Sequence, residues 1–261
     1  MKARPAVKLM TDEKAAKLAV RARSQADAEA ASFYLAREPD SLVSEDVCLY
    51  LGKRKTRKST RAKALFGRCV RKGRQRVLVL DPHDEYSIHG RASEEVILGP
   101  LRQRFEVWQL LAKPKLLNDV NLNAAVVPAR ADPESWARSF EKVLELALEE
   151  GDLVLGLEEF GTWAEHCTKA LNAAAMNSRH QRVPLVAITQ RAKKVPLTFR
   201  SQATHINSGL QSEPEDLDAL ADVAGRPFAE AVKRLARGEW CHWRDSPPEP
   251  QAGPHRRKKP T

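Results

Sequence analysis

Short apolar runs alternate with longer mixed stretches over most of this chain. Runs such as Val77-Leu78-Val79-Leu80 are typical of strands, and the stretches between them have the composition of helices. This alternation predicts βαβ units, and therefore an α/β fold with a mostly parallel central sheet flanked by helices. The clearest strands are expected at residues 47–51, 77–80, 124–127, 153–157 and 185–188.

Helices are expected between and after these strands. The best-defined one begins at Pro133, because Asp132 can cap it and proline suits a first helical turn. The predicted helices cover residues 59–72, 133–150, 160–178, 216–224 and 227–236. Weaker patterns predict short strands at 96–98 and 105–108 and a closing strand at 239–243.

The two ends of the chain differ from its middle. Residues 11–37 are rich in Ala, Lys, Glu and Arg, which predicts one or two surface helices. The run after Asp245 is proline-rich, polar and basic, which is typical of a disordered tail. We therefore predict an N-terminal helical extension (1–45), one α/β domain (46–244) and a basic tail (245–261).

The composition bounds the function. A 42% hydrophobic and 30% charged chain without a long apolar run is expected to be soluble, without membrane insertion, and the first residues lack a secretory signal. A cytoplasmic location follows from this interpretation. The net charge of +10 indicates an anionic partner, for which nucleic acid is the commonest candidate.

The segment Gly52-Lys-Arg-Lys-Thr-Arg-Lys-Ser-Thr60 follows the first strand and resembles a phosphate-binding loop. Gly52, Lys58 and Ser59 have the spacing of its first glycine, its lysine and its metal-binding hydroxyl. Arg57 and Lys55 stand where glycine is usual, and a side chain is costly wherever φ must be positive. The alternative is a solvated basic turn, since residues 53–76 contain twelve basic residues and no acid.

Polar residues also follow three other strands. Glu158 and Glu159 come after the strand at 153–157, where one acid could bind Mg²⁺ and the next could orient or deprotonate a water. Asp81 follows the second strand, in a turn that would be ordinary by itself, and Gln190 follows the strand at 185–188. Open parallel sheets bind ligands at this edge, so the coincidence favours a nucleotide site over separate turns. The alternative for the two glutamates is to complement a helix dipole.

Together these motifs resemble the FtsK/HerA group of P-loop ATPases, in the additional-strand ASCE class. The resemblance includes the packaging ATPases of membrane-containing icosahedral viruses and prophage-encoded relatives, and it covers residues 46–244. Its parts are GKRKTRKST for Walker A, LVLDPHDEY, LVLGLEEF for Walker B, NSRHQRVPLVAITQRAKKVPLTFRSQATHI and GEWCHWR. It implies a RecA-like core that hydrolyses ATP with Mg²⁺.

The resemblance also implies roles for single residues. Nucleotide would be bound by the loop residues Gly52, Lys53, Arg54, Lys55, Thr56, Arg57, Lys58, Ser59 and Thr60. Ser59 and Glu158 would belong to the metal site, and the catalytic residues would be Glu159, Gln190 and Arg179. The family uses an arginine like the last one near the nucleotide, also across a subunit boundary. The candidates for DNA contact are Arg191, Lys193 and Lys194.

The family's partners would be duplex DNA, further copies of the chain in a ring, most often a hexamer, and a capsid or other recruiting protein. The sequence departs from the family at Arg57, at Arg61, which replaces an apolar residue, and at Glu158, where aspartate is usual. These departures leave open a second hypothesis, a catalytically weak or inactive relative that serves as a nucleic-acid-binding or structural subunit. A filamentous-phage assembly protein and a metabolic kinase fit less well, since the chain lacks a membrane span and an acceptor-site pattern.

Overall fold

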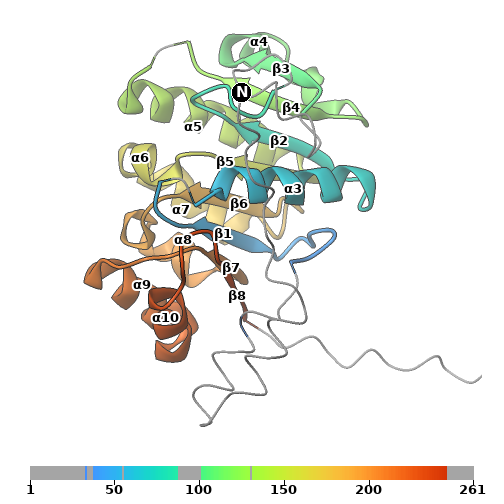
Figure 1. The fold of residues 1–261 in the computed structure, drawn as a ribbon. Helices are drawn as coiled ribbons and strands as arrows, with labels where there is room; N and C mark the ends of the chain where they lie inside the picture. Colours follow the sequence, from blue (N-terminus) through green and yellow to red (C-terminus); the bar gives the residue numbers. More distant parts are fainter. Residues whose placement is uncertain (1–32, 34–37, 55, 88–100, 130, 246–261) are drawn as a thin grey trace, which may run out of the picture.

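The computed structural model describes residue 33 and residues 38–54, 56–87, 101–129 and 131–245. The strands of this part of the chain form one eight-stranded sheet (Figure 1). They are β1 (Val47–Leu51), β2 (Arg76–Leu80), β3 (Gln103–Glu106), β4 (Asn123–Val127), β5 (Leu153–Leu157), β6 (Leu185–Thr189), β7 (His205–Ser208) and β8 (Cys241–Arg244). The five strands expected from the sequence are all present, each within one residue of its predicted bounds.

The sheet is parallel except at one edge. Its strand order is β3-β4-β2-β5-β6-β1-β7-β8, and only β7 and β8 pair antiparallel. The predicted α/β fold with a mostly parallel sheet is therefore confirmed. In the register, Leu51 pairs with Thr189 and with Ser208, and Leu80 pairs with Leu157. The segments that follow β1, β2, β5, β6 and β7 consequently start at the same edge of the sheet.

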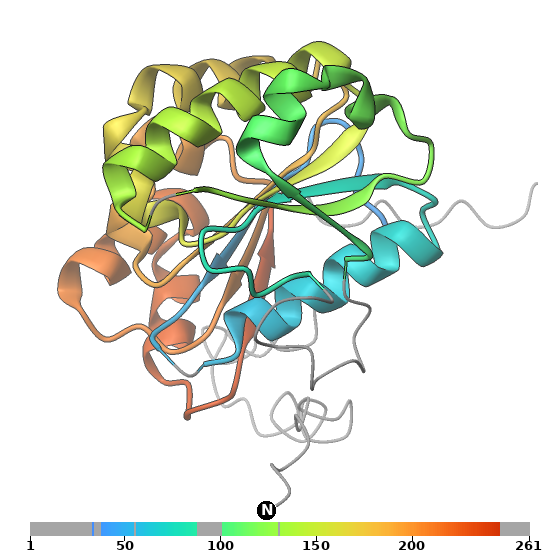
Figure 2. The same cartoon turned by 90° about the horizontal axis from the view of Figure 1, so that it is seen from above.

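Helices cover both faces of the sheet. Figure 2 shows α3 on one side and α4, α5 and α7 on the other. The α-helices are α3 (Lys58–Arg71), α4 (Val107–Ala112), α5 (Pro133–Glu150), α6 (Phe160–Trp163), α7 (Thr168–Asn177), α8 (Leu197–Ser201), α9 (Pro214–Ala224) and α10 (Arg226–Lys233). Short 3-10 helices are η2 (Pro114–Asn118), η3 (Ala164–His166) and η4 (Ala192–Lys194).

The buried strands divide their side chains between two apolar clusters. Leu49 belongs to the cluster under α5 to α10, whereas its neighbour Tyr50 belongs to the cluster under α3. Gly156 in β5 lets α3 approach closely, since a Cβ there would lie 2.6 Å from Cζ of Phe66. This contact brings the helix after the phosphate-loop-like segment against the strand that ends in the acid pair.

Three predicted elements need correction. The expected helix over 160–178 is instead α6, η3 and α7, with a break at Cys167. The strand predicted at 105–108 lies at 103–106, because a capping box between Glu106 and Gln109 starts α4 at Val107. The closing strand lies at 241–244 rather than 239–243.

The sequence pattern did not predict β7, the four-residue strand His-Ile-Asn-Ser. All four of its residues are buried, although three of them are polar. The predicted strand at 96–98 lies outside the described residues, as do most of the predicted N-terminal helices and the tail after Asp245. Phe33 lies in a helix and packs edge-on against Phe228 of α10, and residues 38–45 form a loop.

Two further observations concern the whole described part. None of its helices combines the length and the apolar composition that crossing a bilayer requires. The four cysteines, Cys48, Cys69, Cys167 and Cys241, are buried free thiols.

Candidate nucleotide site

The phosphate-loop-like segment makes a tight turn directly after β1. Gly52 has φ +150°, a conformation that L side chains rarely adopt, and a Cβ there would lie 2.6 Å from Oγ1 of Thr56. Both the backbone N–H and the hydroxyl of Thr56 donate to the carbonyl of Lys53, at 3.2 and 2.7 Å. The first glycine of the motif is thus required by the backbone, as the sequence predicts.

Residues far along the sequence hold this loop. The indole Nε1–H of Trp240 donates to the carbonyl of Thr56 at 3.0 Å. Gly209, just after β7, lies so close that a Cβ on it would be 3.2 Å from Cβ of Thr56. Lys53 reaches the same segment, donating to Ser212 and pairing with Glu213 at 3.3 Å. Lys53 is therefore engaged by protein groups, and Trp240 and Gly209 are contacts that sequence reasoning missed.

Arg57 stands where the phosphate-binding motif usually has glycine, and its backbone has a left-handed conformation that glycine readily adopts. Its φ of 70° and ψ of 33° are left-handed, and it is the N-cap residue of α3. Its side chain makes no capping hydrogen bond, and the first turn of α3 contains no acid. The positive end of the helix dipole therefore faces the loop without a carboxylate of that turn to offset it, which is the arrangement that binds phosphate.

The first turn of α3 carries the next three predicted residues. Lys58 is 8% exposed, and burial lowers the pKa of its ammonium, an effect that Glu158, Glu159 and Glu85 oppose. Ser59 and Thr60 are partly buried, and the hydroxyl of Ser59 donates to Oε1 of Glu158 at 3.1 Å. Arg54 is exposed, and Lys55 lies outside the described residues. Lys58 and Ser59 thus lie beside the acid pair, about a hundred residues away in sequence.

Glu158 is the first residue after β5 and is almost completely buried. Its N–H donates to the carbonyl of Leu80, and its own carbonyl accepts from Nε1 of Trp163 at 2.9 Å. Its two carboxyl oxygens accept from different hydroxyls, Ser59 at 3.1 Å and Tyr86 at 2.5 Å. Burial raises the pKa of Glu158 to about 8, an effect that the hydrogen bond from Tyr86 partly opposes.

Glu159, the second acid of the pair, contacts Gln190 rather than Ser59. It has φ +48° and ψ +34° as the N-cap residue of α6, and it is half-buried. Nε2 of Gln190 donates to its Oε1 at 3.3 Å, and Nε2 of Gln211 donates to the carbonyl of Gln190 at 2.9 Å. The structure therefore brings together the predicted water-orienting acid and the amide at the end of β6.

The loop after β2 completes the site. Asp81 is fully buried, and its two carboxylate oxygens accept the N–H groups of His83 and Tyr86 at 3.3 and 2.8 Å. These bonds turn the chain back so that the Tyr86 side chain meets Glu158. Burial raises the pKa of Asp81 to about 6. The motif was visible in the sequence, but its tyrosine was not predicted to reach the acid pair.

The donor set at this edge fits Mg²⁺. Hydroxyl and carboxylate oxygens are ligands this cation takes, usually together with phosphate oxygens and waters, and Ser59 and Glu158 offer one of each in direct contact. Within the described residues there is no cluster of three or more His, Cys, Asp or Glu that could hold a metal by itself. A cation here would thus depend on the nucleotide for its remaining ligands.

Arg179 does not join this group within one chain. It is exposed in the loop between α7 and β6, and it lines a hollow of about 410 Å³ with Glu45 and Thr204. These neighbours precede β1 and β7, so the hollow lies at the amino edge of the strands, opposite the acid pair.

The three candidates for DNA contact differ in their surroundings. Nε of Arg191 bonds Oδ2 of the buried Asp216 at 3.0 Å, and Lys194 pairs with Glu165 at 3.4 Å. The exposed residue Lys193 donates its backbone N–H to Asp216 at 3.0 Å. Arg191 and Lys194 are thus already paired with carboxylates of the protein.

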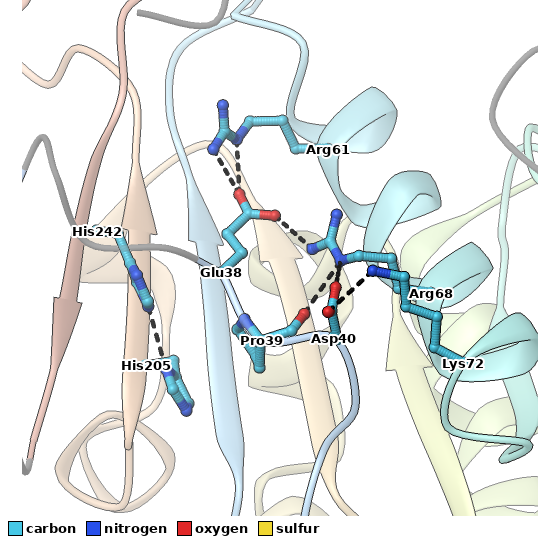
Figure 3. A network of polar contacts seen from close by, with 8 residues as sticks. All are labelled: Glu38, Pro39, Asp40, Arg61, Arg68, Lys72, His205 and His242. Carbon is cyan, nitrogen blue, oxygen red and sulfur yellow. Dashed lines mark hydrogen bonds and ion pairs between the residues drawn. The ribbon is translucent and has the colours of Figure 1, made fainter. Parts of the chain in front are cut away.

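Acids from elsewhere in the chain neutralise much of the basic run. Glu38 accepts from Arg61 and Arg68, and Asp40 pairs with Lys72 (Figure 3). Burial favours a raised pKa for Glu38, but the charges and hydrogen bonds of the two arginines outweigh it and leave the pKa below its usual value. The Arg61 guanidinium also lies 4.9 Å from the ring centroid of Trp240. Arg61 replaces an apolar residue and joins the segment before β1 to the tryptophan that holds the loop.

No protein-family model and no curated protein matches the sequence. Solved structures do match it. The genome packaging NTPase B204 of Sulfolobus turreted icosahedral virus 2, in complex with ATPγS, has a TM-score of 0.59 and 18% identity, over 77% of this chain and 93% of its own. The DNA-packaging ATPase B204 of Sulfolobus turreted icosahedral virus has a TM-score of 0.53 and 19% identity, over 75% and 90%. The fold of this chain is thus similar to that of these two packaging NTPases.

Proposed function

We propose that this chain is an ATPase that couples ATP hydrolysis to the packaging or translocation of DNA. The observation that carries the proposal is the convergence of Lys58, Ser59, Glu158, Glu159 and Gln190 at one edge of the sheet. The hydrogen bonds Ser59–Glu158 and Gln190–Glu159 join the ends of three separate segments. Separate turns would have no reason to meet in this order, whereas a phosphate site with a metal shell and a water-orienting group needs these residue types together.

Each residue then has a role in the reaction. The loop and the open start of α3 bind the phosphates, and Lys58 adds a cation beside them. Ser59 and Glu158 would hold Mg²⁺, which when bound would neutralise developing charge on the phosphates. Glu159 would orient the attacking water and accept its proton, while Gln190 holds the Glu159 side chain and would contact the γ-phosphate.

The proposed partner is duplex DNA, pulled by several copies of the chain in a ring, with a hexamer as the expected form. An assembly of this kind would give Arg179 a place beside the nucleotide of a neighbouring subunit. Lys193 is the best placed of the three candidates for DNA contact, since carboxylates already pair with Arg191 and Lys194. A capsid or other recruiting protein and a cytoplasmic location belong to the same proposal.

The test uses the full chain with a fluorescent ATP analogue, Mg²⁺ and linear duplex DNA. Lys58→Ala should abolish binding of the analogue, and Glu159→Gln should keep binding while slowing hydrolysis on the order of 100-fold. Lys72→Ala and Glu165→Gln are matched controls, because both residues are exposed and lie in ion pairs away from the acid pair. A wild-type chain that neither binds ATP nor hydrolyses it faster with DNA contradicts the proposal.

The second candidate is a subunit that keeps this fold without turnover. The observation that favours it is Arg57, a side chain at the position where phosphate must approach the backbone. Such a protein would bind DNA with a salt-sensitive affinity that ATP does not change. Measuring DNA affinity with and without ATP and Mg²⁺ separates the two candidates.

A further inference from the structure

The contact between Tyr86 and Glu158 has no part in the roles assigned above. The phenol hydroxyl donates to Oε2 of Glu158 at 2.5 Å, the length of a strong hydrogen bond to a carboxylate. Tyr86 is 1% exposed and Glu158 is 3% exposed, so water does not compete for this bond. The bond therefore constrains the acid side chain more than a surface contact would.

The hydrogen bonds divide the carboxyl group between two partners. Oε2 faces Tyr86, and Oε1 faces the hydroxyl of Ser59. A glutamate has one more rotatable bond than the aspartate usual at this position, so its carboxylate could otherwise occupy several places. Because Tyr86 binds Oε2, Oε1 is the carboxylate oxygen that lies next to the hydroxyl of Ser59.

Tyr86 is itself held on several sides. Its N–H donates to Asp81, and its ring packs edge-on against Phe66 of α3 with centroids 5.9 Å apart. Nζ of Lys63 lies 5.0 Å from the ring centroid. The hydroxyl is thus fixed relative to the end of β2, through Asp81, and to α3, the helix that carries Lys58 and Ser59.

We propose that Tyr86 is a positioning residue that holds Glu158 so that one carboxylate oxygen, next to Ser59, is presented to the divalent cation of the nucleotide. The inference rests on the proposed function, because it requires a nucleotide–cation complex at this edge. Tyr86 would thus compensate for the greater length of Glu158 compared with aspartate, because its hydroxyl restricts where the carboxylate can lie.

The chain offers a matched control for the removal of this hydroxyl. Tyr50 in β1 is fully buried as well and lies two residues before Gly52. Its hydroxyl has no hydrogen-bond partner in the described part of the chain. Tyr50→Phe and Tyr86→Phe therefore make the same chemical change at the same depth, and only the second one removes the bond to Glu158.

The experiment measures binding of the fluorescent ATP analogue to the full chain, first without a divalent cation and then during a Mg²⁺ titration. Tyr86→Phe should weaken the apparent Mg²⁺ affinity about 10-fold, as loss of a group that orients a metal ligand commonly does. Binding of the metal-free analogue should stay within about 2-fold, because no phosphate contact changes. Tyr50→Phe should match the wild type in both measurements.

A double-mutant cycle makes the test specific. Glu158→Asp withdraws the carboxylate from the hydroxyl, so Tyr86→Phe should have little further effect in that background. Equal Mg²⁺ affinity of Tyr86→Phe and wild type overturns the inference, and so does an equal loss in Tyr50→Phe or an additive loss in the double mutant. If the wild type binds no ATP analogue at all, the proposed function fails and this inference fails with it.

Discussion

The two long helices of the domain begin in opposite ways. At α5 the Asp132 carboxylate accepts the N–H of Ser135 at 2.8 Å, Pro133 occupies the first turn and Glu134 adds a negative charge beside the dipole. At α3 the N-cap residue is Arg57 in a left-handed conformation, no side-chain cap is made and the first turn has no acid. Residues at the start of α5 cap its N–H groups and offset its dipole, whereas at α3 no residue of the first turn does so.

The cap of α5 stabilises the fold, whereas the uncapped start of α3 lowers stability and leaves its N–H groups available to a ligand. A missing cap costs a helix about 1 kcal/mol, and a left-handed residue other than glycine adds a cost of similar size. The carboxyl that the first turn of α3 contacts is that of Glu158, which accepts the hydroxyl of Ser59, and burial raises the pKa of this carboxyl. The beginning of α3 is thus the place where an added anion, with its cation, would gain most.

The largest expected effect comes from the loop that leads into α3. Gly52→Ala forces a Cβ against Thr56, and we expect nucleotide affinity to fall on the order of 100-fold, or about 3 kcal/mol. Gly238→Ala is the control, because Gly238 also has a positive φ but its Cβ would have nothing within 4 Å. Fluorescence titration of both variants decides the point, and an equal loss in the two would contradict it.

The second effect is a pH dependence at the open start of α3. A carboxyl whose pKa is raised from 4.5 to about 8 keeps its proton longer in the folded state, so its contribution to stability falls as pH rises through that range. Glu158→Gln cannot titrate. Without nucleotide or Mg²⁺, the variant should therefore gain stability relative to wild type between pH 5 and pH 8, by at least about 1.4 kcal/mol, the equivalent of one pKa unit.

Urea unfolding at several pH values measures this gain. Glu165→Gln, which removes an exposed carboxylate of the same type, corrects for the general change in charge. A stability difference between Glu158→Gln and wild type that stays constant from pH 5 to pH 8 would show that this carboxyl is already ionised in the folded protein.

The third effect concerns the satisfied helix. Asp132→Ala removes the cap of α5, and the free energy of unfolding should fall by about 1 kcal/mol. Nucleotide affinity should not change, because α5 packs on the face of the sheet opposite α3. Thermal unfolding and the fluorescence titration report the two quantities separately. A loss of nucleotide affinity without a loss of stability would contradict the assignment of the α5 cap to stability alone.

The smallest effect is expected at Arg57 itself. Arg57→Gly relieves the left-handed conformation but loosens the unfolded chain, so the net gain in stability should be below about 1 kcal/mol. Nucleotide affinity should stay within about 3-fold, since the backbone already has the conformation of a glycine. Arg74→Gly is the control, because Arg74 is also a left-handed arginine but is exposed and lies outside the loop. A strong loss of affinity would mean that the guanidinium contacts phosphate, and a strong gain would mean that it blocks the pocket.

The sequence predicted the parts of the fold that have local signals. Buried parallel strands are continuous apolar runs, and Asp132-Pro133 marks a helix start, so both were found. The strand β7 was missed because His205, Asn207 and Ser208 are polar, and only their neighbours in the sheet make them strand residues. The break at Cys167 has no proline or glycine beside it, so nothing in the local sequence marks it.

The same limit applies to the site. Lys58, Ser59, Glu158 and Gln190 follow strands whose order places them together, so spacing was enough to select them. The groups that hold them were not predictable in this way: the Trp240 indole meets Thr56 across 184 positions, and the Tyr86 hydroxyl meets Glu158 across 72. Such contacts depend on sheet order and side-chain reach, which a pattern along one chain does not contain.

The ion pairs that Glu38 and Asp40 make with Arg61, Arg68 and Lys72 change what the basic run can contribute to DNA binding. Counterion release makes DNA affinity fall with salt in proportion to the number of phosphates that a protein neutralises. Of the twelve basic residues in 53–76, ion pairs within the described chain already engage Lys53, Arg61, Arg68, Lys72 and Arg76. A cation held by a carboxylate releases fewer counterions, so the salt dependence of any DNA complex should be shallower than twelve charges imply.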